Sequence, residues 1–329
     1  MRIVGRMYLL PKEGTFYKAN LHCHTVLSDG HLTAEEVKKA YMEKGYSIVA
    51  FTDHRTYVWH KELDQDDFLS IAAYEVDIND FEKRPGDFSR LQTYHLNLYD
   101  TRPWENKEEK EQSILPERRY RDVTYINGYI ERMKEKGFIT CYNHPYWSLQ
   151  TYEDYKDLRG LFAMEIYNHG CEHDGLFGFN PQAYDEMLRT GQRLYCVATD
   201  DNHNWYPLDH PLSDSFGGFT MIKARQLDYE SVMEALKKGE FYYSMGPEIH
   251  DVYVEEGILY IKTSPVEKIY VMQEGRTCYK EVAAPGTTIS KATFKLTGKE
   301  GYIRVQCKDT KGLFAGTNAY FMENIMLLK

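Results

Sequence analysis

Short apolar runs alternate with amphipathic stretches between about residues 18 and 245 of the chain. The apolar runs have the length of buried β-strands, and the stretches between several of them have the period of helices that cover a sheet. This alternation is typical of βα units around parallel strands, and seven strands approach the number that closes a barrel. The predicted strands are 18–22, 47–52, 71–76, 94–98, 138–142, 161–167 and 194–199.

Three of the intervening helices carry residues that mark their ends. Thr33 followed by Glu36 is a capping box, and the Asn180-Pro181 pair is typical of a first helical turn. Glycine ends each of these helices, as expected where the chain must leave a helix with positive φ. The predicted helices begin near Thr33, Asn180 and Asp228 and end at Gly45, Gly191 and Gly239.

The pattern changes near Gly246-Pro247, where alternating runs separated by glycine turns replace the helical stretches. Runs such as 251–254, 259–261, 268–271 and 302–305 predict an antiparallel β-sandwich of roughly 80 residues. We therefore predict two domains, an α/β domain over 1–246 and a small sandwich over 247–329. A chain of 329 residues with 42% hydrophobic content can form both cores.

Charge and composition narrow the range of partners. A formal net charge of -10 argues against long nucleic acids and anionic membranes, because both require a basic face. The six cysteines are scattered, which predicts neither disulfides nor a thiolate zinc site. No apolar run approaches the ~20 residues that cross a bilayer, and the first residues do not resemble a signal peptide. We expect a cytoplasmic protein.

Potential metal ligands follow nearly every predicted strand. In a βα barrel the carboxyl ends of the strands meet at one mouth, so these distant residues are expected to become neighbours. Imidazole and carboxylate together suit zinc, manganese or iron. The residues are His22 and His24, Asp53 and His54, Glu75, His95, Asn143 and His144, and Asp200, Asp201 and His203.

Each motif also has an ordinary structural explanation. The His22-x-His24 pair can be incidental, although residues two apart share one face of a strand. Asp53-His54 can be a cap beside a buried histidine, and Asn143-His144 can simply end a strand. Six of the twelve histidines at one predicted mouth, however, favour a metal site over core packing.

The motifs together resemble those of the PHP (polymerase and histidinol phosphatase) superfamily. The match consists of His22-x-His24, Ser28-Asp29-Gly30, Thr52-Asp53-His54, Glu75, His95, Asn143-His144-Pro145 and Asp201-x-His203, in the family's order. The resemblance covers roughly residues 17 to 245 and implies a distorted (β/α)7 barrel that holds two to three divalent ions. The C-terminal sandwich is similar to the domain that follows the barrel in one branch of the superfamily.

The resemblance also implies a ligand set. His22, His24, Glu75 and Asp201 would hold one ion, and Glu75 would bridge to a second ion held by His95 and His144. Asp29, His54 and His203 would hold a third, with Asp29 standing where some relatives have histidine. Asn20 replaces an aspartate of many relatives.

Hydrolysis of a small phosphate ester is the predicted reaction. A water or hydroxide shared by two such ions has a pKa near ~7 and is the predicted nucleophile, with Glu75 and Asp201 as catalytic ligands. Arg55 would stabilise developing charge, unless it forms a surface ion pair, and His169 is the best placed of the remaining histidines to contact substrate. The residues expected to orient the ligands, or else to cap strand ends, are Asp53, Asn143 and Asp200.

Three other functions are compatible with the same residues. A carboxylic or carbamate ester could replace the phosphate ester, and phosphate release would distinguish the two. A metal-binding module without activity should have lost ligands, whereas every proposed position here is a competent donor. Polymerase-associated exonucleases occur among the relatives, but the acidic chain has no basic stripe for a long polymer.

Overall fold

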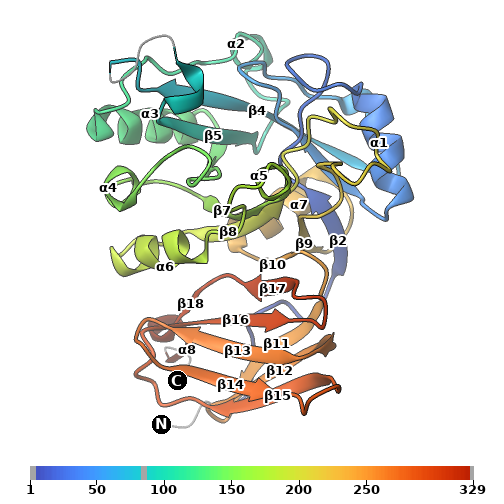
Figure 1. Ribbon diagram of the computed structural model, residues 1–329, viewed down its shortest axis with the longest axis vertical. Helices are drawn as coiled ribbons and strands as arrows, with labels where there is room; N and C mark the ends of the chain where they lie inside the picture. The colour runs from blue at the N-terminus through green and yellow to red at the C-terminus, as the bar shows by residue number, and fades with distance from the viewer. Residues whose placement is uncertain (1–4, 83–86, 327–329) are drawn as a thin grey trace.

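The computed structural model describes residues 5–82 and 87–326 and contains two stacked parts (Figure 1). The upper part is a mixed sheet with helices around it, and the lower part is formed by antiparallel strands. The α/β class predicted from the sequence is therefore confirmed. The strands of the upper part are β2 (Thr15–Asn20), β3 (Ile48–Phe51), β4 (Leu69–Asn79), β5 (Thr93–Asp100), β6 (Phe138–Tyr142), β7 (Ala163–Asn168), β8 (Tyr195–Thr199), β9 (Phe219–Ala224) and β10 (Phe241–Ser244).

The helices lie mostly in the connections of the upper part. The capping box at α1 (Ala34–Glu43) is present, because the Thr33 hydroxyl accepts from Glu36 N at 3.2 Å and the Glu36 carboxylate accepts from Thr33 N at 2.8 Å. All three helices predicted from their end residues are confirmed. The α-helices are α1 (Ala34–Glu43), α2 (Lys107–Lys110), α3 (Val123–Glu135), α4 (Tyr152–Tyr155), α5 (His169–His173), α6 (Pro181–Arg189), α7 (Tyr229–Lys238) and α8 (Met322–Met326), and 3-10 turns span Lys61–Leu63 and Phe88–Arg90.

The seven predicted strands are all present, but they are not all parallel. The order runs β9-β2-β3-β4-β5-β6-β7-β8, with parallel pairing from β2 to β4 and from β6 to β8. The expectation of parallel strands throughout is wrong for β5, which is antiparallel to β4 and to β6. An antiparallel neighbour needs no crossover helix, and β5 pairs back along β4 from Thr93 opposite Asn79 to Tyr99 opposite Ala73.

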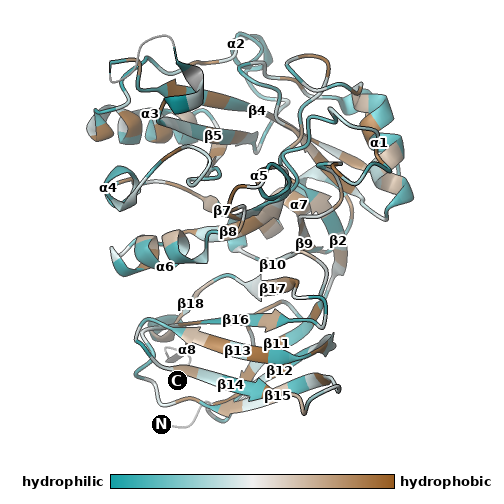
Figure 2. Cartoon of the chain, in the orientation of Figure 1, coloured by the Kyte–Doolittle hydropathy of each residue, from teal (hydrophilic) through white to brown (hydrophobic). Residues whose placement is uncertain are grey.

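The two terminal strands of this series, β9 and β8, are joined by hydrogen bonds of one side chain. The Thr220 hydroxyl on β9 donates to Ala198 O on β8 at 3.0 Å and accepts from Ala198 N at 3.2 Å. Every residue of β3, β5 and β7 is buried, as expected for strands covered on both faces. Figure 2 shows the apolar residues concentrated on strands such as β4 and β7. The polar residues on these buried strands are therefore exceptions that require partners.

The lower part is formed by two antiparallel sheets that share a core of valine, leucine and isoleucine. One sheet has the order β1-β11-β12-β15, and the other continues the upper sheet through β10, β17, β16, β13 and β14. The buried Arg304 of β16 donates to Asp185 of α6 at 2.7 Å and so joins the two parts. These strands are β1 (Arg6–Tyr8), β11 (Ile249–Glu255), β12 (Ile258–Val266), β13 (Lys268–Gln273), β14 (Cys278–Val282), β15 (Ile289–Lys295), β16 (Tyr302–Lys308), β17 (Phe314–Thr317) and β18 (Tyr320–Phe321).

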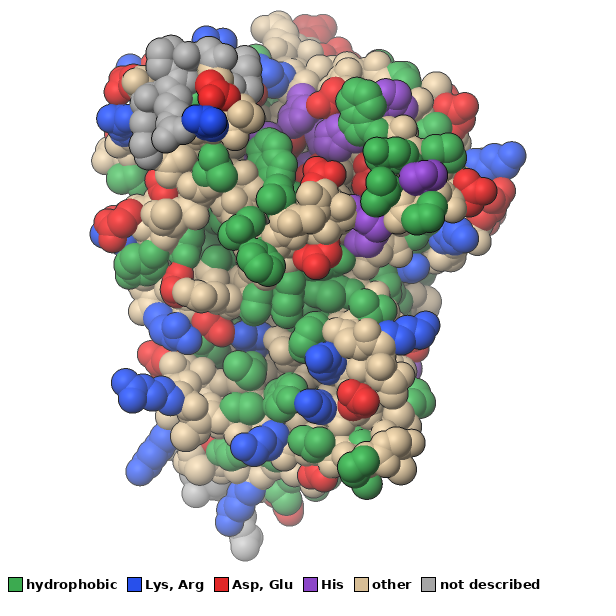
Figure 3. Space-filling model, viewed as in Figure 1, with side chains coloured by type: hydrophobic (Ala, Val, Ile, Leu, Met, Phe, Trp, Pro, Cys, Tyr) green, Lys and Arg blue, Asp and Glu red, His purple; other side chains and the backbone are tan. Residues whose placement is uncertain are grey.

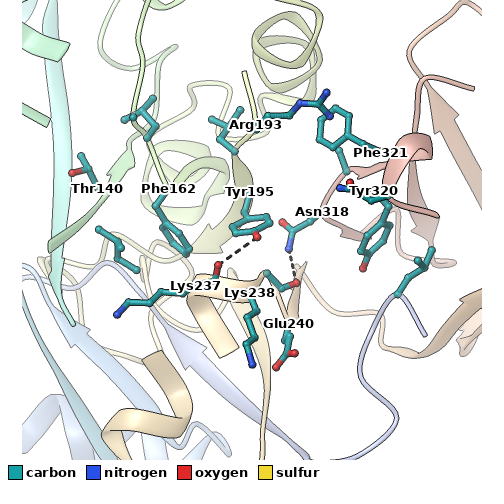
Figure 4. Close-up of a pocket in the computed structure, with 18 of the residues that line it drawn as sticks. Thr140, Phe162, Arg193, Tyr195, Lys237, Lys238, Glu240, Asn318, Tyr320 and Phe321 are labelled. Carbon is teal, nitrogen blue, oxygen red and sulfur yellow. Dashed lines mark hydrogen bonds between the residues drawn. The ribbon is translucent and has the colours of Figure 1, made fainter. Parts of the chain in front are cut away.

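A cavity of about 1050 Å³ lies between the starts of β6, β7 and β8 and the C-terminal strands (Figure 4). Its walls are tied together by the Tyr195 hydroxyl, which donates to Lys237 O, and by Asn318 Nδ2, which donates to Gly239 O. None of the described residues that line it is a histidine. The candidate chemistry lies at a smaller cavity at the other ends of these strands. Within the described residues, no helix has the length and apolarity needed to cross a membrane.

Candidate metal centre

The nine predicted ligands lie together at one end of the strand series, which is the carboxyl end of the parallel strands and the amino end of the antiparallel β5. His22 and His24 follow β2, His54 follows β3, Glu75 lies within β4 and His95 within β5. His144 follows β6, and Asp201 and His203 follow β8, while Asp29 lies in the turn after His24. Figure 3 shows the histidines gathered on one side of the upper part, beside acidic groups. Most of these side chains border a cavity of about 270 Å³.

Glu75 occupies the centre of the cluster and is almost completely buried. Its Oε1 lies 3.1 Å from His95 Nδ1 and 3.5 Å from His144 Nε2. Its Oε2 lies 3.0 Å from His54 Nδ1. Burial raises the pKa of Glu75, but the imidazoles around it outweigh burial and hold the pKa well below its usual value. Glu75 is therefore ionised, and its two oxygens face different imidazoles.

His22 and His24 form a second group with Asp201. The two Nε2 atoms lie 3.1 Å apart, and each is 3.1 Å from Asp201 Oδ1. Burial, and next the neighbouring His203, lower the pKa of His24 to about 3, so this imidazole is neutral at pH 7. A neutral imidazole has an unprotonated nitrogen that can bind a metal.

Asp29, His54 and His203 form the most open group. Asp29 Oδ2 lies 3.6 Å from His54 Nε2, and Asp29 Oδ1 lies 3.4 Å from His203 Nε2. The Asp29 side chain is 50% exposed, whereas His22 and His24 are fully buried. His24 Nδ1 belongs to the same cluster, at 3.7 Å from Asp29 Oδ1. The cluster is therefore most accessible to solvent on the side of Asp29.

The donor set fits divalent metal ions. Bonds of ~2.0–2.2 Å at tetrahedral angles separate two ligand atoms by about 3.3–3.6 Å. The separations between ligand atoms in the three groups, 3.0 to 3.7 Å, are close to this value. The buried His24 Nδ1 has no hydrogen-bond partner among the described residues, which is unusual for a buried polar atom. It faces Asp29 Oδ1 across 3.7 Å, within the group that also contains His54 and His203.

Glu165 was not predicted and supports two of the ligands. Its Oε1 accepts from His22 Nδ1 and Thr199 Oγ1, both at 2.7 Å. Its Oε2 accepts from His144 N at 3.1 Å and from Asn168 Nδ2 at 3.0 Å. Because four donors occupy its two oxygens, Glu165 fixes the proton of His22 on Nδ1 and leaves Nε2 free for a metal. The feature of the sequence that could have identified Glu165 is its position as a charged residue within the apolar run 163–167.

The three residues predicted to orient ligands have different surroundings. Asn143 Nδ2 donates to Glu75 Oε1 at 2.8 Å. Asp53 accepts from Thr25 N at 2.8 Å and thereby holds the turn that leads to Asp29. Asp200 accepts from the backbone N–H groups of residues 216–218, at 2.8 to 2.9 Å. Asn143 thus contacts a proposed ligand directly through its side chain, and the other two hold loops around the cavity.

The side chains of Arg55 and His169 contact residues outside the proposed ligand set. The Arg55 guanidinium donates to Asp77 Oδ1 at 3.0 Å, which is the ion-pair alternative considered for it. His169 Nδ1 is 2.9 Å from the Tyr167 hydroxyl, and a Cβ added at Gly217 would lie 2.1 Å from the His169 ring. Burial, and then His173, lower the pKa of His169 to about 4. His169 is thus a neutral imidazole packed against Gly217.

Positive φ angles occur at the same strand ends. Arg55, His144 and Asp201 have φ values of 58°, 22° and 54°. Such angles are unfavourable for residues with a Cβ and persist where the surroundings enforce them, often at functional sites. Here they accompany the sharp bends that turn His144 and Asp201 toward the cavity.

Comparison with known proteins gives structural matches only. No protein-family description matches the chain. No curated protein matches it either. A two-domain protein from Bacteroides vulgatus ATCC 8482, containing a predicted PHP-like metal-dependent phosphoesterase, is similar with 17% identity and a TM-score of 0.45, over 95% of this chain and 98% of that chain.

A second match is a protein from Bifidobacterium adolescentis ATCC 15703 that is proposed to be a metal-dependent phosphoesterase. It has 14% identity and a TM-score of 0.39, over 70% of this chain and 98% of that chain. Both similarities are too low to assign a function to this chain, and the features that bear on its chemistry lie in the cavity itself. Its His, Asp and Glu clusters could hold divalent metal ions.

Proposed function

We propose that the protein is a metal-dependent phosphoesterase of the PHP type that hydrolyses small phosphate esters. The observation that carries this proposal is that six imidazoles and three carboxylates gather around one cavity, which four of these imidazoles and all three carboxylates line, and that Glu75 lies within 3.6 Å of five of the imidazoles. Buried acids and imidazoles at this density require protons or cations between them. Divalent zinc, manganese or iron would satisfy them with the ligand types that these metals prefer.

The proposed ligand groups are those that the sequence motifs indicate. His22, His24, Glu75 and Asp201 would hold one ion, and Glu75 with His95 and His144 a second. Asp29, His54 and His203 would hold a third. Divalent ions bound there would supply a water of lowered pKa and Lewis acidity toward a phosphoryl oxygen.

The chain's own groups prepare the site for an anionic substrate. Glu165 keeps a proton on His22 Nδ1, and Asn168 Nδ2 donates to Asp201 Oδ2 at 3.0 Å, so both ligands are fixed before substrate binds. Three divalent ions would bring six positive charges against three ligand carboxylates, and this excess attracts phosphate despite the acidic surface. Arg55 and His169 have no role in this proposal, because each is engaged elsewhere.

We also propose that β2 to β8 form the distorted (β/α)7 barrel of a domain spanning residues 1–246, followed by a sandwich over 247–329 to which β1 adds one strand from the N-terminal segment. The hydrogen bonds of Thr220 between β8 and β9 support closure of the strand series. A shared apolar core between the two antiparallel sheets supports the sandwich.

Phosphate release by metal-loaded protein tests the proposal. The protein is purified without chelator, loaded in turn with Zn²⁺, Mn²⁺ or Fe²⁺, and assayed against phosphomonoesters, phosphodiesters and carboxylic esters. We expect phosphate release without carboxylic-ester turnover. Glu75→Gln should lower kcat/KM more than about a hundredfold, since even partners outside the ligand shell cost ~10–100-fold.

A matched control is Glu131→Gln, which makes the same change at an exposed residue of α3 that pairs with Lys134 on the surface. The control should retain full activity. Phosphate release by Glu75→Gln at the level of this control would contradict the proposal, as would turnover of carboxylic esters alone.

A further inference from the structure

Large apolar side chains are exposed around the mouth of the metal cavity. Trp205 and Phe177 are 68% and 67% exposed, and Trp147 is 40% exposed. Most of the large apolar side chains exposed among the described residues lie in the loops that follow β2, β6, β7 and β8. Figure 3 shows hydrophobic groups beside the histidines. Scattered exposed apolar residues are ordinary, but a cluster at one mouth indicates a binding surface.

Five aromatic residues make up this surface, which we call the aromatic collar: Tyr146, Trp147, Phe177, Trp205 and Tyr206. Tyr146 and Phe177 come from different loops and meet edge to face with their centroids 5.0 Å apart. Trp205 packs on His31, at 4.0 Å between centroids. These contacts hold the rings in place before any ligand binds, which lowers the entropy lost on binding.

Two collar residues line the metal cavity itself. Trp147 lies beside two proposed ligands, with its ring centroid 5.3 Å from that of His95 and 5.1 Å from that of His144. Trp205 follows His203 by two residues and also borders the cavity. A group bound to the metals would therefore contact indole surface as it leaves the cavity.

The size and charge of the cavity restrict the kinds of substrate that can bind at the collar. A volume of about 270 Å³ is below the ~300–1,000 Å³ of pockets that enclose a drug-sized ligand, so a substrate of that size would extend out of the cavity onto the collar. The described residues that line the cavity include Asp174 and Asp214 but no lysine or arginine. Additional phosphates outside the metal centre would therefore find carboxylates instead of cations.

We propose that the substrate is a phosphate monoester whose alcohol part carries an uncharged aromatic ring, and that Trp147 and Trp205 bind this ring. This inference rests on the proposed function and names its substrate class. Aromatic rings stack on indoles with a preference beyond that given by the area they bury. The collar thus selects among phosphate esters that the metals alone would not distinguish.

Binding of non-hydrolysable phosphonates tests the inference without turnover. Metal-loaded protein is titrated by calorimetry with inorganic phosphate, methylphosphonate and phenylphosphonate. We expect phenylphosphonate to bind about tenfold more tightly than methylphosphonate. Trp147→Ala and Trp205→Ala should each reduce this ratio to about threefold or less. Both side chains are substantially exposed, so these variants should fold.

Trp104→Ala is the matched control, because Trp104 is also exposed, at 47%, but packs on Tyr229 away from the cavity. It should keep the tenfold ratio. Equal binding of both phosphonates, an unchanged ratio in both collar variants, or collar-dependent binding to phosphatidylcholine vesicles would overturn the inference. If inorganic phosphate and both phosphonates fail to bind, the proposed function itself fails.

Discussion

Replacing Glu165 with Gln changes one atom of a fully buried carboxylate. All four groups that contact its oxygens are donors in the present arrangement: His22 Nδ1, Thr199 Oγ1, His144 N and Asn168 Nδ2. A glutamine amide offers one acceptor oxygen and an NH₂ group that only donates. One pair of donors must therefore face the NH₂ group.

The two orientations of the substituted amide have different costs. If its NH₂ group faces His22, the imidazole must move its proton to Nε2, the nitrogen that lies 3.1 Å from Asp201. If the NH₂ group faces His144 N, a buried backbone donor remains unsatisfied, at a cost of about 1–3 kcal/mol. The first outcome removes a metal ligand, and the second moves the backbone that positions another.

We therefore expect Glu165→Gln to weaken metal binding by about 10–100-fold, equivalent to about 1.4–2.8 kcal/mol. Competition with a chelator of known affinity measures this change, and urea unfolding of the metal-free protein measures the cost to stability. The exposed Glu131→Gln variant is again the control. Unchanged metal affinity together with an unchanged free energy of unfolding would refute the role assigned to Glu165.

Three further variants test other parts of the structure. Asp29→Ala should lose about one metal equivalent, because it lies in only one group, and elemental analysis against wild type measures this loss. Arg304→Ala leaves Asp185 buried without its partner and should lower the free energy of unfolding by about 3–5 kcal/mol in urea titrations. A smaller loss for Arg304→Ala than for the alanine substitution of an exposed arginine would contradict this expectation. Gly217→Ala places a Cβ on the His169 ring and should cost about 1–3 kcal/mol by the same titration.

Much of the upper part could be predicted because its strands are buried runs between recognisable helix ends. β9 and β10 were not predicted. β9 (Phe219–Ala224) mixes apolar and polar residues without strict alternation, and it pairs antiparallel with both β2 and β10, so it lacks the pattern of a buried parallel strand. β10 (Phe241–Ser244) follows a glycine that ends α7, and its two partners, β9 and β17, are far apart in sequence. Pairing between distant segments leaves no local signal.

Most of the ligands could be predicted because they stand beside another polar residue at the end of an apolar run, whereas Glu75 and His95 lie within their runs and were found from the order of the motifs. Glu165 has no such neighbour, and its partners His22 and Thr199 come from strands that only the fold brings together. The contact between Arg55 and Asp77 is equally a product of the fold, since an arginine after a strand can face a substrate or an acid. The sequence predicts residue types at strand ends, but the partner of each side chain depends on tertiary structure.

Anomalous diffraction from crystals of metal-loaded protein, recorded at the absorption edge of the bound metal, would show whether the cavity holds divalent ions. We expect two or three peaks within ~2.0–2.3 Å of ligand atoms, with Glu75 shared between two of them. A cavity without anomalous peaks at full metal loading, or metals bound only at other surface sites, would contradict this expectation.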